Sequence, residues 1–294
     1  MPFAPLYDVP TERRAYTELA RVKNGNGRVG LLMLHGFLGS PLSSHPMANY
    51  LAKHGVSVHC PLLPGHGHYP DKLYKVPRQA WLDEAQEAFE TILSQYDELF
   101  LMGHSMGAVL AAHLCLQNPA VRGLIMLTPL YEAPDDRLKW MKVLRFVMPW
   151  FYPYKLRSMR KLVRERVLDF DPTIDFDDPD FQQNELPRVS RVSTASLVEM
   201  VKMAEYGRTL WPKLTTPSII FRGGHDPAVK PGTIDKLYDV LPGLHKKLIT
   251  FAEAGHEPMR PFDPAHKELW PQALEFIRTY STVGLTAVFP KMTR

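Results

Sequence analysis

The 294-residue sequence has few cysteines and little excess of one charge. Cys60 and Cys115 are its two cysteines, and both lie in apolar stretches without the paired spacing of a disulfide framework. We therefore expect a reducing, cytoplasmic location. Thirty-five Lys and Arg against 31 Asp and Glu give a net charge of +4. This charge is too small to indicate a nucleic-acid partner.

Long hydrophobic runs are also missing. No stretch approaches the roughly eighteen consecutive apolar residues of a membrane span. Residues 1–8 lack the basic and apolar regions of a signal peptide. Hydrophobic residues make up 45% of the chain and charged residues 22%, which is typical of a folded protein rather than a disordered or fibrous one.

Apolar runs and helical spacing alternate along most of the chain. The runs that are typical of parallel strands covered on both faces are residues 29–34, 56–60, 99–102, 123–127, 217–221 and 247–251. The segments with helical spacing are residues 43–53, 79–95, 105–117, 197–206, 233–241 and 270–280. This order predicts right-handed crossovers and an α/β fold, in which helices flank a mostly parallel central sheet.

The alternation stops between about residues 131 and 191. We therefore predict one α/β core, made of residues 1–130 and 192–294, with residues 131–191 inserted as a helical cap. Ten Lys or Arg and one acid occupy residues 137–166, whereas residues 167–187 hold seven acids and no base. Because such complementary segments usually pair on a solvated face, we expect ion pairs within the cap.

A serine motif lies between an expected strand and an expected helix. Residues 103–107 are Gly-His-Ser-Met-Gly. A serine that attacks a carbonyl needs a sharp turn to project its hydroxyl, and the two glycines keep the crowded backbone free of side chains. Ser105 also lies at a helix N-terminus, whose dipole favours developing negative charge. Ser105 is therefore the candidate nucleophile.

The loop after the first central strand is the candidate oxyanion hole. Residues 35–40 are His-Gly-Phe-Leu-Gly-Ser, and their glycines allow the backbone to approach a substrate closely. We predict that the amides of Phe37 and Met106 donate to the oxyanion, where one such donor contributes about 2.7–4 kcal/mol. Without the serine motif, this loop would be interpreted as a plain turn.

The acid and the base are expected later in the chain, since this serine motif is followed by the acid and then the histidine. Asp226 and His256 each follow one of the last two expected strands. Both therefore lie at the carboxyl edge of the sheet, where the sites of such folds form. His256 would accept the serine proton, and Asp226 would fix the imidazole tautomer. Glu253 precedes the histidine and Asp235 falls inside a helix, so both are weaker candidates for the acid.

With these motifs the sequence resembles the α/β-hydrolase superfamily, and within it the carboxylesterase and monoacylglycerol-lipase-like serine hydrolases. The motifs that carry the resemblance span nearly the whole chain and are residues 35–39, 63–67, 103–107, 224–226 and 254–256. The resemblance implies that Ser105, Asp226 and His256 hydrolyse carboxylic esters through an acyl-enzyme, without a cofactor. The serine in the motif of residues 103–107 distinguishes this sequence from the haloalkane dehalogenases and epoxide hydrolases of the superfamily, which use aspartate at that position.

The cap departs from the family pattern and carries an aromatic segment from Trp140 to Tyr154. This segment is interpreted as an acyl pocket, as a contact with a membrane surface, or as ordinary packing within the cap. The candidate substrate-binding residues are Trp140, Phe146, Trp150 and Phe151. Pro149 and Pro153 exclude one long amphipathic helix, which weakens the membrane interpretation. The expected substrates are small esters with short or medium acyl chains, or monoacylglycerols.

Other functions are compatible with the same candidate residues, Ser105, Asp226 and His256. Acyl transfer, carbon–carbon bond hydrolysis and perhydrolysis remain alternatives to ester hydrolysis, as does a non-catalytic binding protein, which would be expected to lack a triad member. His59, His66 and His68 lie close together in the sequence. No carboxylate or cysteine near them completes a recognisable ligand set, so we expect no metal site.

Overall fold

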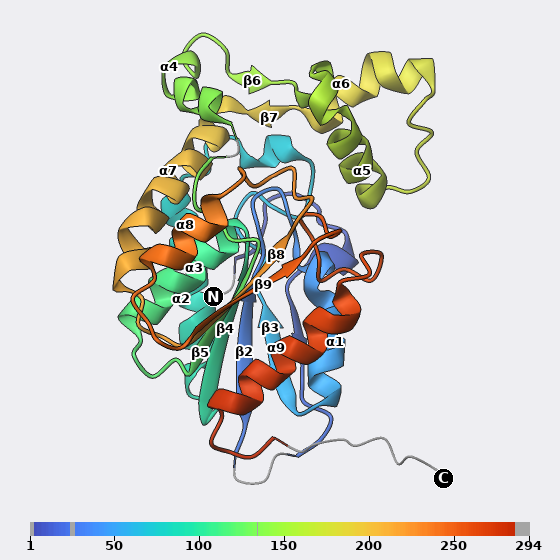
Figure 1. Cartoon of the computed structure of the whole chain (residues 1–294). Helices are drawn as coiled ribbons and strands as arrows, with labels where there is room; N and C mark the ends of the chain where they lie inside the picture. Colours follow the sequence, from blue (N-terminus) through green and yellow to red (C-terminus); the bar gives the residue numbers. More distant parts are fainter. Residues whose placement is uncertain (1–2, 24–26, 134, 286–294) are drawn as a thin grey trace.

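A seven-stranded sheet forms the centre of the protein (Figure 1). The computed structural model describes residues 3–23, 27–133 and 135–285. The strands lie in the order β1-β3-β2-β4-β5-β8-β9. Only β1 is antiparallel to its neighbour, and the other neighbouring pairs are parallel. The predicted α/β fold with a mostly parallel central sheet is therefore confirmed.

The strands of this sheet lie close to the apolar runs of the sequence. They are β1 (Tyr16–Glu18), β2 (Val29–Leu34), β3 (Val56–Cys60), β4 (Glu98–His104), β5 (Gly123–Leu127), β8 (Ser218–Gly223) and β9 (Lys246–Phe251). β1 was not predicted, because three residues at a sheet edge are too few to show a hydrophobic period.

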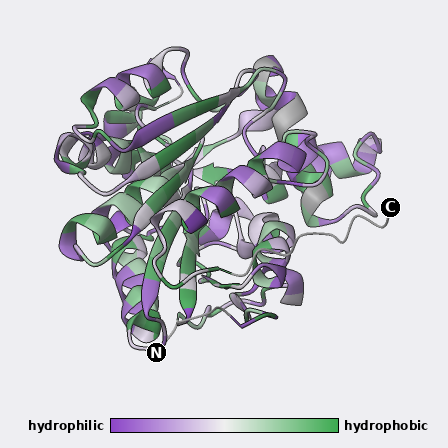
Figure 2. Cartoon of the chain, turned by 60° about the horizontal axis from the view of Figure 1, so that its bottom comes forward, coloured by the Kyte–Doolittle hydropathy of each residue, from purple (hydrophilic) through white to green (hydrophobic). Residues whose placement is uncertain are grey.

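Helices cover both faces of the sheet. One face carries α1 (His45–Lys53) and α9 (His266–Tyr280), and the other carries α2 (Arg78–Leu93), α3 (Met106–Gln117), α7 (Thr194–Leu210) and α8 (Thr233–Val240). Within β2, Leu32 and Leu34 pack on the α3 side, whereas Leu31 and Met33 pack on the α1 side. The central strands β2, β4 and β5 are buried along their whole length and are therefore mainly apolar without alternation, whereas the edge strands β1 and β9 are only partly buried. Figure 2 shows green, hydrophobic residues along strands inside the molecule.

Residues 131–133 and 135–191 lie above the carboxyl ends of the strands and form two lobes (Figure 1). The first lobe contains α4 (Met141–Leu144) and β6 (Trp150–Phe151), which pairs with β7 (Val192–Ser193). The second lobe contains α5 (Arg160–Phe170) and α6 (Leu186–Ser190). As predicted from the prolines, no long helix runs through the aromatic segment, because α4 ends at Leu144. In the described part of the chain, no helix is long and apolar enough to cross a membrane.

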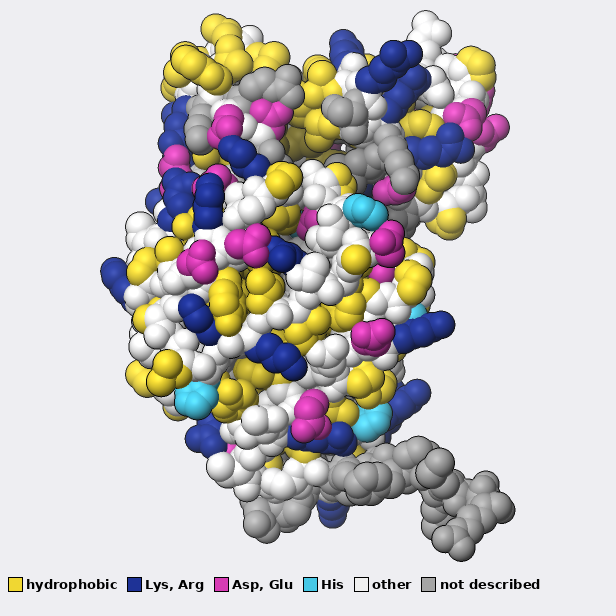
Figure 3. Space-filling model, viewed as in Figure 1, with side chains coloured by type: hydrophobic (Ala, Val, Ile, Leu, Met, Phe, Trp, Pro, Cys, Tyr) yellow, Lys and Arg dark blue, Asp and Glu magenta, His cyan; other side chains and the backbone are white. Residues whose placement is uncertain are grey.

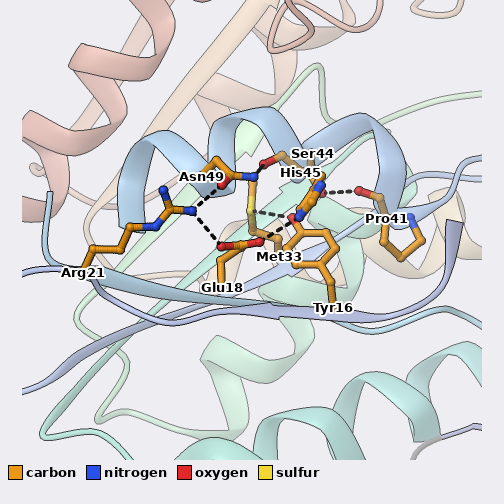
Figure 4. A network of polar contacts seen from close by, with 8 residues as sticks. All are labelled: Tyr16, Glu18, Arg21, Met33, Pro41, Ser44, His45 and Asn49. Carbon is orange, nitrogen blue, oxygen red and sulfur yellow. Dashed lines mark hydrogen bonds and ion pairs between the residues drawn. The ribbon is translucent and has the colours of Figure 1, made fainter. Parts of the chain in front are cut away.

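A polar network fastens the edge strand β1 to the start of α1 (Figure 4). Its members are Tyr16, Glu18, Arg21, Met33, Pro41, Ser44, His45 and Asn49. Glu18 Oε1 lies 2.9 Å from His45 Nε2, and this hydrogen bond lowers the pKa of Glu18. Arg21 donates both to Glu18 and to Asn49. The network thus holds a three-residue strand against the helix beside it.

Candidate active site

Ser105 lies in the sharp turn between β4 and α3. Its φ of 52° and ψ of −115° are values that residues other than glycine rarely adopt. Its amide donates to the Leu127 carbonyl oxygen at 2.9 Å, which holds the turn on β5. A Cβ on Gly107 would lie 2.0 Å from the Leu34 carbonyl oxygen, and a Cβ on Gly103 would lie 2.3 Å from the α3 backbone. Close packing therefore requires both glycines of the motif.

The structure brings His256 and Asp226 together at the carboxyl edge of the sheet. His256 Nδ1 lies 2.7 Å from Asp226 Oδ2, and their side chains are only 15% and 4% exposed. The other carboxylate oxygen, Oδ1, accepts a hydrogen bond from the amide of Ala228 at 2.8 Å. Because Nδ1 faces the carboxylate, Nε2 is the ring nitrogen left to exchange a proton with a substrate or a serine.

The two weaker candidates for the acid are engaged elsewhere. Glu253 is 89% exposed and lies 3.5 Å from the ring of His225. Asp235 pairs with Arg222 at 2.7 Å. Their positions favour Asp226 as the partner of the histidine.

Two side chains fasten the loop of His256 to the rest of the site. His104 Nε2 donates to the His256 carbonyl oxygen at 2.8 Å, and Thr128 Oγ1 donates to the same oxygen at 3.0 Å. The His104 and His256 rings are 4.7 Å apart. Burial lowers the pKa of His104 to about 4, so this ring is neutral near pH 7 with its proton on Nε2. The role of Thr128 was missed, although it directly follows β5 at the same edge of the sheet.

The candidate oxyanion loop lies against the serine turn. A Cβ on Gly36 would lie 3.1 Å from the Cβ of Ser105. His35 Nε2 accepts a hydrogen bond from the amide of Leu63 at 3.1 Å, so Nδ1 carries the proton and donates to the Gly36 carbonyl oxygen at 3.0 Å. Burial lowers the pKa of His35 to about 4, which keeps this tautomer neutral. The loop is thus held by a hydrogen bond on each side of the histidine ring, one within the loop and one to the segment that follows β3.

The two predicted oxyanion donors, the amides of Phe37 and Met106, lie in different surroundings. The ring of Phe37 packs edge-on against His66 and Trp81, with centroids 6.1 Å and 6.0 Å away. No hydrogen bond between described residues uses the Phe37 amide as its donor. Met106 is the first residue of α3, where amide groups have no acceptor within the helix. Both amides therefore remain available to an oxyanion.

The predicted cap residues occupy two different settings. Trp140 and Phe146 are 70% and 76% exposed, so most of each side chain faces solvent. They belong to the lobe of α4, where hydrophobic side chains gather on the outer surface in Figure 3. Trp150 and Phe151 are half-buried, and the Trp150 ring lies 5.3 Å from the ring of Tyr74, which is itself 44% exposed. Among the described residues, no group of three His, Cys, Asp or Glu is arranged to hold a metal.

The charges of the cap pair only in part as predicted. Arg164 pairs with Asp177 at 2.8 Å, within the cap. Arg166 instead lies 3.3 Å from Glu257, the residue that follows His256. The prediction of ion pairs within the cap is therefore wrong for Arg166, and Glu257 is a residue of the site that the sequence did not reveal.

Comparisons with known proteins agree with this architecture. Residues 26–264 match the family described as serine aminopeptidase, S33. A thermostable monoacylglycerol lipase of Bacillus sp. (strain H-257) is 24% identical over 238 residues, which cover 81% of this chain and 86% of the relative. A carboxylesterase of Bacillus subtilis (strain 168) is 20% identical over 231 residues, which cover 78% and 85%.

A solved structure extends the likeness to the fold. The monoacylglycerol lipase of Paleococcus ferrophilus matches with a TM-score of 0.66 at 18% identity, over 91% of this chain and 100% of that chain. The resemblance to the α/β-hydrolases is thereby confirmed. Because the family match spans most of the sequence, the chain belongs to the serine aminopeptidase S33 family of α/β-hydrolases.

Proposed function

We propose that the protein hydrolyses carboxylic esters with Ser105, His256 and Asp226 as its catalytic triad. The observation that carries the proposal is the buried 2.7 Å contact between His256 Nδ1 and Asp226 Oδ2 beside a strained serine turn. An aspartate in this place keeps the proton on Nδ1, so that Nε2 accepts the proton of the serine. The relatives named monoacylglycerol lipase and carboxylesterase support an ester as the substrate.

The reaction proceeds in two halves. Ser105 Oγ attacks the ester carbonyl carbon while His256 takes the hydroxyl proton, and the amides of Phe37 and Met106 stabilise the oxyanion. His256 then gives the proton to the leaving alcohol, which leaves an acyl group on the serine. His256 then takes a proton from a water molecule as that water attacks the acyl carbon, and it returns the proton to Ser105 Oγ as the bond between Oγ and the acyl carbon breaks and the carboxylic acid departs. Apart from the substrate and water, each group in this scheme belongs to the chain, so the proposed scheme uses no cofactor.

The proposed substrates are esters with short or medium acyl chains, or monoacylglycerols. The cap supports this choice, because its aromatic segment supplies two half-buried residues, Phe151 and Trp150, and the Trp150 ring lies 5.3 Å from the ring of Tyr74. The monoacylglycerol lipase relative supports it independently. We propose the alcohol or acyl part of a small ester, rather than a protein or nucleic acid, as the group that lies under the cap.

Hydrolysis of p-nitrophenyl esters from acetate to palmitate, and of a monoacylglycerol, tests the proposal. We expect a maximum at one chain length, and a loss of at least about 10³-fold in Ser105→Ala. An aminoacyl p-nitroanilide is the comparison substrate, because the family description names an aminopeptidase. Cleavage of this amide without cleavage of any ester would overturn the proposal. Alcohol or peroxide added to the assay separates acyl transfer and perhydrolysis from hydrolysis by their products.

A further inference from the structure

Glu257 is a buried carboxylate between two arginines, directly after His256. Its side chain is 11% exposed, and Oε2 accepts a hydrogen bond from Arg260 Nη1 at 3.1 Å. Oε1 lies 3.3 Å from Arg166 Nη2. Burial alone would raise the pKa of Glu257, but the nearby positive charges, with Arg166 the strongest, lower it to about 2. The carboxylate is therefore ionised wherever an esterase of this kind is assayed.

The two arginines come from different parts of the protein. Arg260 lies three residues after Glu257, so this ion pair moves together with the loop of the base. Arg166 lies on α5, in the cap lobe that overhangs this loop in Figure 1. Of these two ion pairs, only the one between Arg166 and Glu257 depends on the position of the cap.

The other end of α5 is anchored on the core. The Phe170 ring lies 4.4 Å from the ring of Tyr69, and the guanidinium of Arg13 lies 4.7 Å over the Phe170 ring. Phe170 and Arg166 are four residues apart, so they share a face of the helix. One face of α5 thus contacts the core at an aromatic anchor and, one turn earlier, at the loop that carries His256.

We propose that Glu257 is a positioning residue for the general base, and that Arg166 makes this positioning depend on the cap. The proposal rests on the proposed function, because it treats His256 as the base. With α5 on the core, Arg166 and Arg260 together compensate the buried carboxylate. When α5 moves away, Arg260 alone remains, and a buried charge that has lost a partner destabilises the loop around it. Proton transfer at Ser105 is thereby coupled to closure of the cap.

Substitution of the ion pair tests this coupling. We expect Arg166→Met and Glu257→Gln each to lower kcat for p-nitrophenyl butyrate on the order of tenfold, with KM changed less than about twofold. The rate at which a fluorophosphonate labels Ser105 should fall in parallel, since this reaction also needs the base. The double variant should be no slower than the slower single variant, because each single substitution already removes the same Arg166–Glu257 ion pair. Arg166→Lys keeps the charge and should restore most of the activity.

A second ion pair between the cap and the core provides the matched control. Lys142 on α4 lies 2.8 Å from Glu205 on α7, and this pair does not include the loop of the base. Lys142→Met should change kcat less than about twofold. Thermal unfolding shows whether each variant is folded. If Arg166→Met is not, the isosteric Glu257→Gln and the rescue by Arg166→Lys decide the question.

The outcomes separate the two proposals. If the wild-type enzyme is active and the Arg166→Met variant keeps the same kcat and labelling rate, the coupling is refuted while the proposed function stands. An equal loss in Lys142→Met, or single losses that multiply in the double variant, would also refute it. If the wild-type protein neither reacts with the fluorophosphonate nor cleaves an ester, the proposed function itself fails, and the coupling fails with it.

Discussion

Replacement of Asp226 by asparagine is the most direct probe of the proposed triad. In the structure, Oδ1 accepts from the Ala228 amide while Oδ2 faces His256 Nδ1. Asp226→Asn preserves the shape, and its amide oxygen keeps the bond to Ala228. Its amide nitrogen then faces Nδ1 as a donor, so the imidazole must move its proton to Nε2. That nitrogen can no longer accept the proton of Ser105, which is the tautomer error expected to reduce kcat by about 10⁴-fold.

This loss corresponds to about 5.5 kcal/mol of transition-state stabilisation. Steady-state hydrolysis of p-nitrophenyl butyrate measures it, with thermal unfolding to show that the variant is folded. Asp235→Asn and Glu253→Gln are the matched controls, because these acids lie beyond the same two strands but contact Arg222 and His225 instead. Each should keep kcat within about threefold. An Asp226→Asn variant that retains more than about a tenth of the activity would refute the assignment of the acid.

Three further substitutions test separate features. Gly107→Ala should destabilise the fold by at least about 3 kcal/mol in thermal unfolding, because the new Cβ would lie 2.0 Å from the Leu34 carbonyl oxygen. His104→Ala removes a donor to the His256 carbonyl oxygen, and kinetics should show kcat roughly tenfold lower with KM unchanged. Burial raises the pKa of Glu84 from 4.5 to about 7, so its stabilising protonated form is lost as the pH rises through 7. Glu84→Gln should therefore stabilise the protein on the order of 2 kcal/mol at pH 8 and little at pH 4, by chemical denaturation.

Each of these substitutions has a control in the same chain. Gly255→Ala should leave the unfolding temperature unchanged, since nothing lies within 4 Å of its added Cβ. His225→Ala should leave kcat unchanged, because that ring is 70% exposed. Glu90→Gln removes an exposed carboxyl and should have the same small effect at both pH values. If a control variant changed the measured quantity as much as its test variant does, the corresponding prediction would be contradicted.

The core could be predicted from the sequence because each strand is marked by a local pattern. The expected runs 29–34, 56–60 and 123–127 coincide with β2, β3 and β5. Residues that are buried on both faces must be apolar at each position, and this leaves a continuous signal. The edge strand β1 carries no such signal, since its pairing with β3 and its polar contacts to α1 are made by residues far away in the sequence.

The geometry of the candidate site was predictable where a motif or a strand end marks it. Ser105 is placed by its glycines, and the meeting of Asp226 with His256 follows from parallel strands that end at one edge. Thr128 and Glu257 were missed because a single polar residue in a loop has no period and no fixed neighbours. Their importance comes from the atoms that they contact, namely the His256 carbonyl oxygen and the guanidinium of Arg166.

The ion pair between Arg166 and Glu257 could not be predicted from the charge pattern alone. Basic and acidic runs that are close in the sequence predict pairing with each other, and Arg164 does pair in this way with Asp177. Two residues along an α-helix are turned by about 200°, so Arg166 points to the opposite side of α5 from Arg164. That side is the one on which Phe170 meets the core. Once one residue of the helix is known to face the core, the helical period assigns each arginine to its side, and Arg166 is placed toward the loop that carries His256.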